Sequence, residues 1–140
     1  PYTTLFRSWH SLEHIHQISD LFQNISRLLK PNGILVVAVP NLNAPERVFY
    51  KRGWAPFDTP RHLYHFQTKT LIKLCQRYGF QIYRKFSMYQ DTPYNILLSI
   101  SQYTLVQDLK AGVVTIYSFL KTLMKGPDFS SSILIICKKF

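Results

Sequence analysis

HSLEHIHQISDLFQNISRLLKPNGILVVAVPN, residues 10–41, decides the fold of this 140-residue chain. Apolar residues at three- and four-residue steps predict an amphipathic helix over 12–29; they are Leu12, Ile15, Ile18, Phe22, Ile25 and Leu29. The tripeptide Pro31-Asn32-Gly33 cannot continue this helix and tolerates a sharp reversal. The run ILVVAV at 34–39 is apolar at odd and even positions, which is typical of a parallel strand covered on both faces. The stretch therefore predicts half of an α/β layer.

The predicted layer places two segments at one edge of the sheet. In open parallel sheets, ligands bind beyond the carboxyl ends of the strands. Residues 40–66 follow the predicted strand directly. Residues 10–14 precede a helix that must run back antiparallel to that strand. We expect the two segments to meet over one cleft.

Several short motifs carry a family resemblance: H-x-L-E-H at 10–14, RLLKPNG at 27–33, VPN at 39–41, DTPRHLYHF at 58–66 and YGF at 78–80. In this order they resemble class I S-adenosylmethionine-dependent methyltransferases, in the branch of ubiquinone-type and sugar-type small-molecule enzymes. The resemblance covers about residues 10–86, with a weaker match at 132–139. It implies the C-terminal part of a Rossmann-like methyltransferase sheet with antiparallel edge strands. It also implies S-adenosylmethionine as the cofactor and methyl transfer to an oxygen or nitrogen of a small-molecule acceptor.

The chain departs from this family at its beginning. The family's glycine-rich cofactor turn and its ribose-binding acidic residue lie upstream of the H-x-L-E-H motif, whereas only nine residues precede His10 here. The chain has no G-x-G-x-G pattern. Residues 1–8, PYTTLFRS, match the translation of a common short-read sequencing adapter, so we expect an assembly artefact there. We expect 9–140 to be a partial methyltransferase domain that is inactive alone.

The remaining sequence predicts elements that complete this half of the sheet. In chain order they are an ordered lid or substrate loop at 41–66, a helix at 68–78 with Thr68 as its N-cap and Gly79 as its stop, a strand at 80–86, one or two helices at 94–124 that break near Gly112, and a strand at 133–137. The resemblance makes the last two strands antiparallel neighbours. Residues 88–131 would then be a helical insertion between them.

Methyl transfer needs an acceptor held in line and, for a hydroxyl or amine, a base that removes a proton. Histidine suits this role because its ordinary pKa lies near neutral pH. We expect His62 to be the base, with His14 and Glu13 as further candidates. Arg61 offers a forked donor to an anionic substrate group, or it pins the loop by an ion pair with Asp58.

The resemblance also implies roles for residues around the expected cleft. The cofactor-binding candidates are His10, Ser11, Leu12 and Glu13, and the substrate-binding candidates are Asn41, Trp54, Asp58, Tyr64 and His65. The alternative for Trp54 and Tyr64 is that their rings fill the core rather than stack on an acceptor.

A divalent metal is the alternative use of the H-x-L-E-H motif. His10, Glu13 and His14 share one face of a helical turn, and His62 or His65 could complete a site across the cleft. Some relatives carry an E-x-x-E-H segment that ligates magnesium. Here His10 replaces the first glutamate, which weakens a site for a hard cation. We therefore expect no metal.

Charge leaves two other classes of function open. Seventeen Lys and Arg against seven Asp and Glu give +10, which favours nucleic acid, anionic membranes or anionic substrates. A nucleic-acid-binding or RNA-modifying domain would need its basic residues on one face. A membrane-surface module would use 94–124, where Lys110, Lys121 and Lys125 border an apolar surface.

Compartment and assembly are less constrained by the sequence. Cys75 and Cys137 have no disulfide or metal spacing and predict buried thiols in a reducing compartment. We expect a cytoplasmic protein, with peripheral membrane contact as the alternative. The sequence sets no oligomeric state.

Sequencing the source DNA across the codon for Trp9 tests the artefact at residues 1–8. We expect a natural upstream region that encodes a strand, a G-x-G-x-G turn and a later acidic residue within about a hundred residues. A natural gene that encodes ProTyrThrThr at this point would contradict the expectation.

Overall fold

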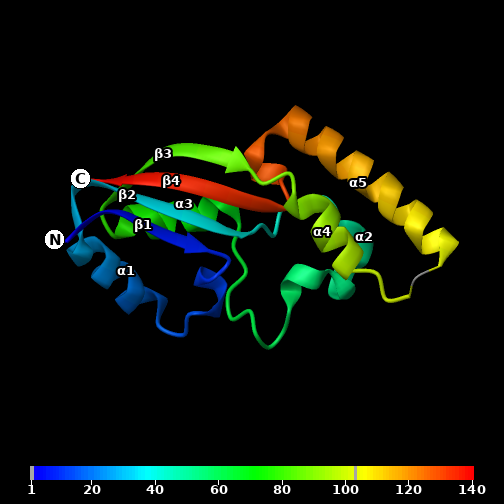
Figure 1. Cartoon of the computed structure of the whole chain (residues 1–140), viewed down its shortest axis with the longest axis horizontal. Helices are drawn as coiled ribbons and strands as arrows, with labels where there is room; N and C mark the ends of the chain where they lie inside the picture. Colours follow the sequence, from blue (N-terminus) through cyan, green and yellow to red (C-terminus); the bar gives the residue numbers. More distant parts are fainter. Residues whose placement is uncertain (1, 103) are drawn as a thin grey trace.

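The computed structural model describes residues 2–102 and 104–140. Its centre is a four-stranded sheet in the order β1-β2-β4-β3, formed by β1 (Thr3–Trp9), β2 (Leu29–Pro40), β4 (Ser132–Lys139) and β3 (Phe80–Ser87) (Figure 1). β1 pairs with β2 in parallel, and β4 is antiparallel to both β2 and β3. Strands β1, β2 and β3 therefore run in the same direction, and their carboxyl ends share one edge. This confirms the α/β fold with antiparallel strand pairs at one side of the sheet.

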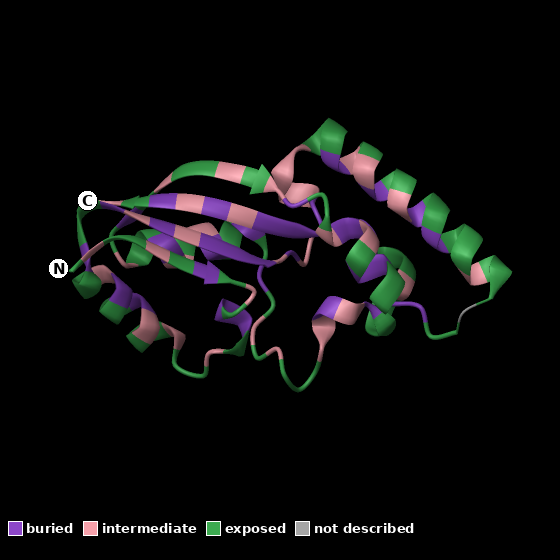
Figure 2. Ribbon diagram, in the orientation of Figure 1, coloured by how far each residue is buried: buried purple, intermediate pink, exposed green. Residues whose placement is uncertain are grey.

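Helices α1 (Ile18–Leu28) and α3 (Thr68–Arg77) form one core with the sheet. The odd-numbered residues of β2 and β4 point into this core, where Phe22 of α1 contacts Phe80 of β3. On the other face, Ala38 and Ser132 are buried near the carboxyl end of β2, but Ile34, Val36, Leu134 and Ile136 are only partly buried. Figure 2 shows the alternation of buried and partly buried residues along the two central strands. The sequence predicts that both faces of β2 are covered. Among the described residues, only one face of β2 is fully covered.

The first helix begins later than the periodicity predicts. Residues Leu12–His14 form a separate 3-10 turn, η1, and Ile15 is extended at φ −83° and ψ 119°. Leu12 is nevertheless buried in the same core as Phe22. Four of the six residues of the predicted apolar stripe are buried, while Ile15 and Ile18 are only partly buried, and the helix itself starts at Ile18.

The predicted reversal at Pro31-Asn32-Gly33 is a bulge at the start of β2. Thr3 pairs with Leu29, but Leu5 pairs with Ile34, so the intervening residues of β2 protrude from the ladder. Asn32 adopts a positive φ of 63°. A Cβ added to Gly33 would lie 2.8 Å from the carbonyl oxygen of Lys30, so this close approach requires glycine.

Residues 1–8 had been left out of the predicted fold, but Thr3–Trp9 forms the edge strand β1. Its last residues align with the carboxyl-terminal half of β2, where Ser8 pairs with Val37. The backbone N–H of His10 then donates to the carbonyl of Ala38 at 2.9 Å. This pairing places the H-x-L-E-H motif at the carboxyl edge of the sheet.

The segment 41–66 contains three short helical pieces: α2 (Arg47–Tyr50), η2 (Lys51–Gly53) and η3 (Ala55–Phe57). At its end, Gln67 rather than Thr68 is the N-cap of α3, because Thr68 is already the first residue of the helix. The hydroxyl of Thr70 donates to the carbonyl oxygen of Gln67 at 2.8 Å. Gly79 ends α3 with a φ of 83°, as predicted.

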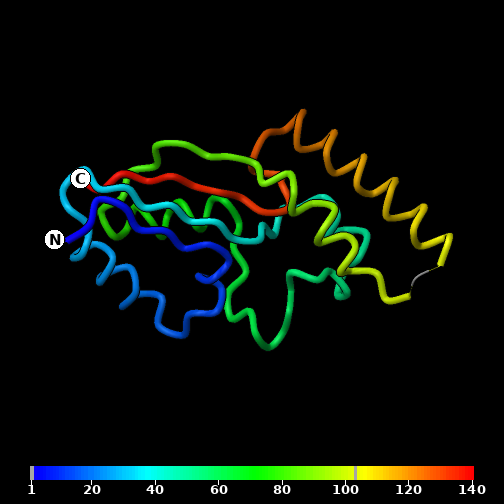
Figure 3. The backbone as a smooth tube through the Cα atoms, viewed as in Figure 1, coloured from blue at the N-terminus to red at the C-terminus, as the bar shows by residue number. Residues whose placement is uncertain are grey.

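The insertion between β3 and β4 contains α4 (Asp91–Leu98), α5 (Leu105–Lys125) and the turn η4 (Pro127–Phe129). The tube in Figure 3 shows α5 extending beyond the end of the sheet. α5 continues through Gly112, so the predicted break there is wrong. One glycine disfavours a helix by only about 1 kcal/mol, and burial of Ala111 and Val114 offsets it.

Both cysteines are buried free thiols, as predicted. Cys75 of α3 lies against Cys137 of β4. Their hydrogen bond and the burial of Cys75 raise the pKa of its thiol well above the usual value. The pair therefore belongs to the core rather than to a reactive site.

Two glycine substitutions should have opposite effects on stability. Gly33→Ala should lower the free energy of unfolding by about 1–3 kcal/mol, because the new Cβ meets backbone. Gly112→Ala is the matched control; nothing lies within 4 Å of its Cβ position, and it should raise stability by about 0.5–1 kcal/mol. Urea unfolding followed by circular dichroism measures both. Equal effects would contradict the bulge geometry.

Candidate functional site

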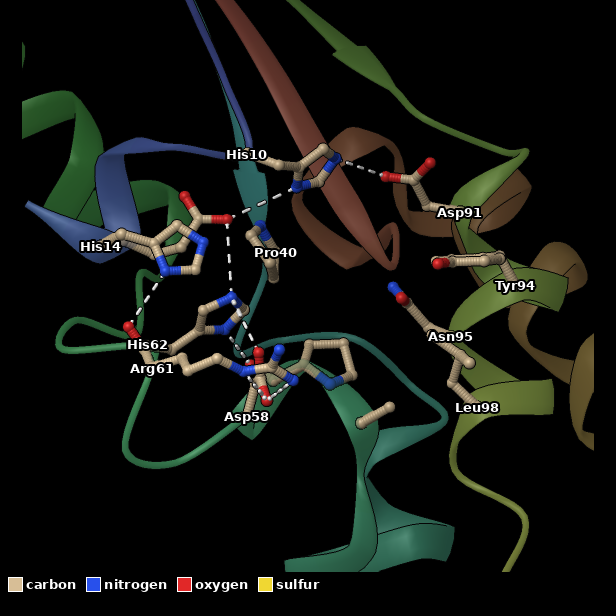
Figure 4. A pocket seen from close by; sticks show the side chains of 13 residues that line it. His10, His14, Pro40, Asp58, Arg61, His62, Asp91, Tyr94, Asn95 and Leu98 are labelled. Atoms are coloured by element: carbon tan, nitrogen blue, oxygen red, sulfur yellow. Dashed lines mark hydrogen bonds and ion pairs between the residues drawn. The ribbon is translucent and has the colours of Figure 1, made fainter.

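A cavity of about 590 Å³ lies at the carboxyl edge of the sheet. Three parts of the chain line it: the segment after β1, the loop after β2, and helix α4 after β3 (Figure 4). The segments 10–14 and 40–66 thus meet over one cavity, as the topology predicts.

Glu13 lies at the junction of these segments. Its backbone carbonyl accepts hydrogen bonds from the N–H groups of Leu63 at 2.8 Å and Tyr64 at 3.3 Å. Its side chain is 1% exposed, and within the described part of the chain its carboxylate oxygens have no hydrogen-bond partner. The Oε1 atom lies 3.6 Å from His10 Nδ1 and 4.0 Å from His62 Nε2.

His10 bridges Glu13 to helix α4. Its Nε2 lies 3.0 Å from Oδ2 of Asp91, and its backbone has a positive φ of 44°. Burial lowers the pKa of His10, but the hydrogen bond to Asp91 and the nearby carboxylates of Asp91 and Glu13 outweigh it and raise the pKa to about 9. His10 is therefore a cation at neutral pH and faces two carboxylates.

His62 and His14 are held by the backbone in the same way. Nδ1 of His62 lies 2.7 Å from the carbonyl oxygen of Pro56, and Nδ1 of His14 lies 3.0 Å from that of Arg61. A carbonyl only accepts, so each Nδ1 must carry the proton. In the neutral rings this leaves each Nε2 free to accept a proton or to bind a ligand.

Glu13, His14 and His62 also form a candidate metal cluster. Each offers one ligand atom, and these atoms lie within 4.8 Å of one another. His65, which the sequence offered as a ligand, instead has its Nε2 3.0 Å from the Phe57 carbonyl oxygen.

Arg61 forms an ion pair with Asp58, the second of the two roles considered for it. Its Nη2 and Nε lie 2.7 Å and 3.0 Å from Oδ1 of Asp58. Asp58 Oδ2 lies 3.9 Å from His62 Nε2. The pair therefore shapes the cavity wall beside His62.

The structure does not bring four of the predicted substrate residues to the cavity. Asn41 is buried and donates to the carbonyls of Asp128 and Ser130, which ties β2 to the start of β4. Trp54 is 2% exposed and packs edge-on against Phe57.

Tyr64 and His65 also lie outside the cavity lining. The hydroxyl of Tyr64 donates to the His16 carbonyl at 3.1 Å, and its ring stacks on Phe66. Two cofactor candidates have local contacts as well: Leu12 packs in the core, and the hydroxyl of Ser11 bonds that of Ser8 at 2.9 Å.

Sequence reasoning missed the wall supplied by α4, which consists of Asp91, Tyr94, Asn95 and Leu98. The signal was present, because β3 runs parallel to β1 and β2. The rule about carboxyl ends therefore applies to the residues after Ser87 as well.

Three of the chain's seven acidic residues line this one cavity: Glu13, Asp58 and Asp91. The cations His10 and Arg61 line the same cavity and pair with Asp91 and Asp58, so one carboxylate charge remains in excess. The cavity therefore suits a ligand that carries positive charge.

Comparison with protein families identifies the domain. The profile of the Methyltransferase domain family matches residues 3–85, which is more than half of the chain. The chain belongs to this family. The match includes the methyltransferase cavity segments 10–14 and 40–62 but not α4. No curated protein matches the chain significantly.

Solved structures share the methyltransferase fold at low sequence identity. One is the complex of a Haloferax volcanii methyltransferase with the activator Trm112 (TM-score 0.61, 14% identity, 99% of this chain and 54% of that one). Another is an S-adenosylmethionine-dependent methyltransferase of Archaeoglobus fulgidus (0.54, 15%, 99% and 60%). A third is phosphoethanolamine N-methyltransferase 2 of Haemonchus contortus with S-adenosylmethionine (0.53, 14%, 97% and 33%). The chain thus spans between a third and three fifths of their length.

The pKa of His10 can be measured by NMR titration of its ring. We expect a midpoint near pH 9 and a lower one in Asp91→Asn, because the variant removes an acceptor and a charge. Since the folded pKa lies above 6.5, the stabilisation is full below pH 6.5 and is lost as pH rises through about 9. Asp58→Asn is the control and should leave the midpoint in place. An ordinary midpoint in the unaltered protein would contradict the His10–Asp91 contact.

Proposed function

We propose that this chain is the C-terminal part of an S-adenosylmethionine-dependent methyltransferase that acts on an oxygen or nitrogen of a small molecule. The observation that carries the proposal is the orientation of His62, whose Nδ1–H is held by Pro56 while Nε2 faces Glu13 at the cavity. S-adenosylmethionine would supply a methyl group activated by a positively charged sulfonium. The acidic lining of the cavity fits a cofactor of that charge.

His62 would act as the general base. Its Nε2 is positioned to take a proton from an acceptor hydroxyl or amine, and the nearby Glu13 carboxylate would stabilise the resulting imidazolium. His14, whose ring centroid is 4.7 Å from that of His62, would orient the acceptor. Arg61 would act indirectly by holding Asp58.

The segment after β1 would form the cofactor side of the cavity. We assign the cofactor's charged end to Glu13 and His10, with Leu12 and Ser11 setting the backbone between β1 and η1. Asp58 would contact the acceptor from the opposite wall. Asn41, Trp54, Tyr64 and His65 would support the loop rather than touch the acceptor.

The chain alone should be inactive. Its sequence has no G-x-G-x-G turn to hold the cofactor, and the second face of its sheet is only partly covered. Half-buried Ile34 and Val36 are surfaces that a further layer would cover. Activity is therefore proposed for the complete protein.

We propose that methyl transfer requires no metal. The only carboxylate of the cluster Glu13, His14 and His62 already faces His10, which is cationic at neutral pH. Its charge is therefore already neutralised, and a divalent ion would find no other carboxylate among the three ligands. The alternative is a divalent ion on these three ligands, which would polarise an acceptor hydroxyl.

Nucleic-acid binding is less well supported. Lys and Arg occur on all four strands and on every described α-helix except α4. Phosphate binding needs them along one face.

We retain a cytoplasmic location as a proposal.

Substitution of His62 tests the proposed base in the complete protein. His62→Gln should lower the rate of transfer from radiolabelled S-adenosylmethionine to phenolic and amine acceptors by about 10²–10⁴-fold. Its affinity for S-adenosylhomocysteine, measured by calorimetry, should not change. His65→Gln, outside the cavity, is the matched control and should retain activity.

Equal rates for His62→Gln and unaltered protein would contradict the assignment. Loss of activity on treatment with EDTA, restored by a divalent ion, would show instead that the cluster holds a metal.

A further inference from the structure

Most of the large apolar residues of helix α5 face away from the domain on which the helix packs. It contacts the domain through small and polar buried residues: Ala111, Val114, Ser118 and Thr122. Its outer face, defined here as Leu105, Val106, Leu109, Val113, Ile116, Leu120, Leu123 and Met124, is between 55% and 81% exposed (Figure 2). A continuous apolar stripe of this kind marks a binding surface.

Cations border this outer face along one side. At 100° per residue, Lys110 and Lys121 lie between the outer and the buried faces of α5, and Lys125 is exposed at the C-terminal end of the helix. The Nζ of Lys121 lies 5.4 Å from the ring centroid of Tyr117, and that of Lys110 lies 5.3 Å from the ring of Tyr50. These contacts hold the lysines at the margin of the apolar face.

Helix α2 extends the surface on this cationic side. The ring of Phe49 lies 5.4 Å from that of Tyr117, and Val48 beside it is 65% exposed. The next residues, Lys51 and Arg52, are exposed as well. At α2, as at α5, exposed apolar side chains thus lie next to exposed cations.

A shallow groove of about 330 Å³ lies where the apolar outer face of α5 meets the bordering lysines. Tyr117, Leu120 and Met124 line it together with the alkyl stems of Lys121 and Lys125, which place two ammonium groups beside an apolar groove. An acyl chain with an anionic head group matches this pairing.

We infer that α5 and α2 form a docking surface for an anionic membrane. α5 would lie in the plane of the interface, with its outer face among the acyl chains and its lysines at the phosphates. None of the helices in the described ranges 2–102 and 104–140 is long and apolar enough to cross a membrane. Asp108 is the single acidic residue on α5, so little opposes the attraction.

Charge argues against a second copy of the chain as the occupant. Two copies that met through these faces would each bring a net charge of +10 and the same lysine margin. Their repulsion would oppose association. Anionic lipid instead complements this charge.

Vesicle sedimentation of the complete protein tests the inference. We expect binding to vesicles of phosphatidylcholine that contain phosphatidylglycerol as an anionic lipid. Binding should be much weaker to pure phosphatidylcholine, and 0.5 M salt should weaken it, because screening shortens the reach of the lysines.

Two pairs of variants separate the apolar and the cationic contributions. Ile116→Asn with Leu120→Asn should weaken binding by at least about tenfold, whereas Tyr83→Asn, an exposed aromatic on β3, should not. Lys121→Gln with Lys125→Gln should abolish the preference for anionic vesicles, whereas Lys69→Gln with Lys73→Gln on α3 should preserve it. Circular dichroism checks that each variant keeps its helix content.

Three results would overturn the inference. They are no sedimentation with either vesicle, equal binding to neutral and anionic vesicles, and a dimer in light scattering that Ile116→Asn with Leu120→Asn dissociates. The last would show that a second copy covers the outer face.

Discussion

The burial of one carboxylate, that of Glu13, governs the arrangement of the site. A buried carboxylate that lacks hydrogen bonds destabilises a protein unless opposite charge lies close by. Here His10 supplies that charge, and Asp91 of α4 keeps His10 protonated. The backbone carbonyl of Glu13 also fixes the loop that carries His62, through the N–H of Leu63. One residue thus sets the positions of the segments that follow β1, β2 and β3.

This arrangement explains how a strongly basic chain can form an acidic cavity. The parallel strands bring Glu13, Asp58 and Asp91 to one edge, although they are far apart in sequence. His62 is then placed beside two of these carboxylates, where a proton taken from an acceptor would be stabilised. The excess of positive charge lies elsewhere, including the margin of α5. The cavity would therefore attract a cationic ligand, and the surface of α5 would attract an anionic one.

Local patterns predicted much of this fold, and tertiary contacts decided the rest. The strands at 34–39, 80–86 and 133–137 follow from the apolar patterns of the sequence. The shared edge follows from the common direction of β1, β2 and β3, to which β4 is antiparallel. The start of α1 was missed because bonds from the loop hold Glu13 in a separate turn. Trp54 and Asn41 were assigned to substrate because the sequence does not show which aromatic and amide side chains the core will bury. Asp91 was missed because its partner, His10, is 81 residues away.

The tautomer of His62 tests the account most directly. Long-range ¹H–¹⁵N NMR of the histidine rings distinguishes a protonated nitrogen from a free one. The account predicts that in the neutral ring the proton resides on Nδ1 and Nε2 is unprotonated, because Pro56 offers only an acceptor. A proton on Nε2 in the neutral ring would contradict the role of His62 as the base that faces the cavity.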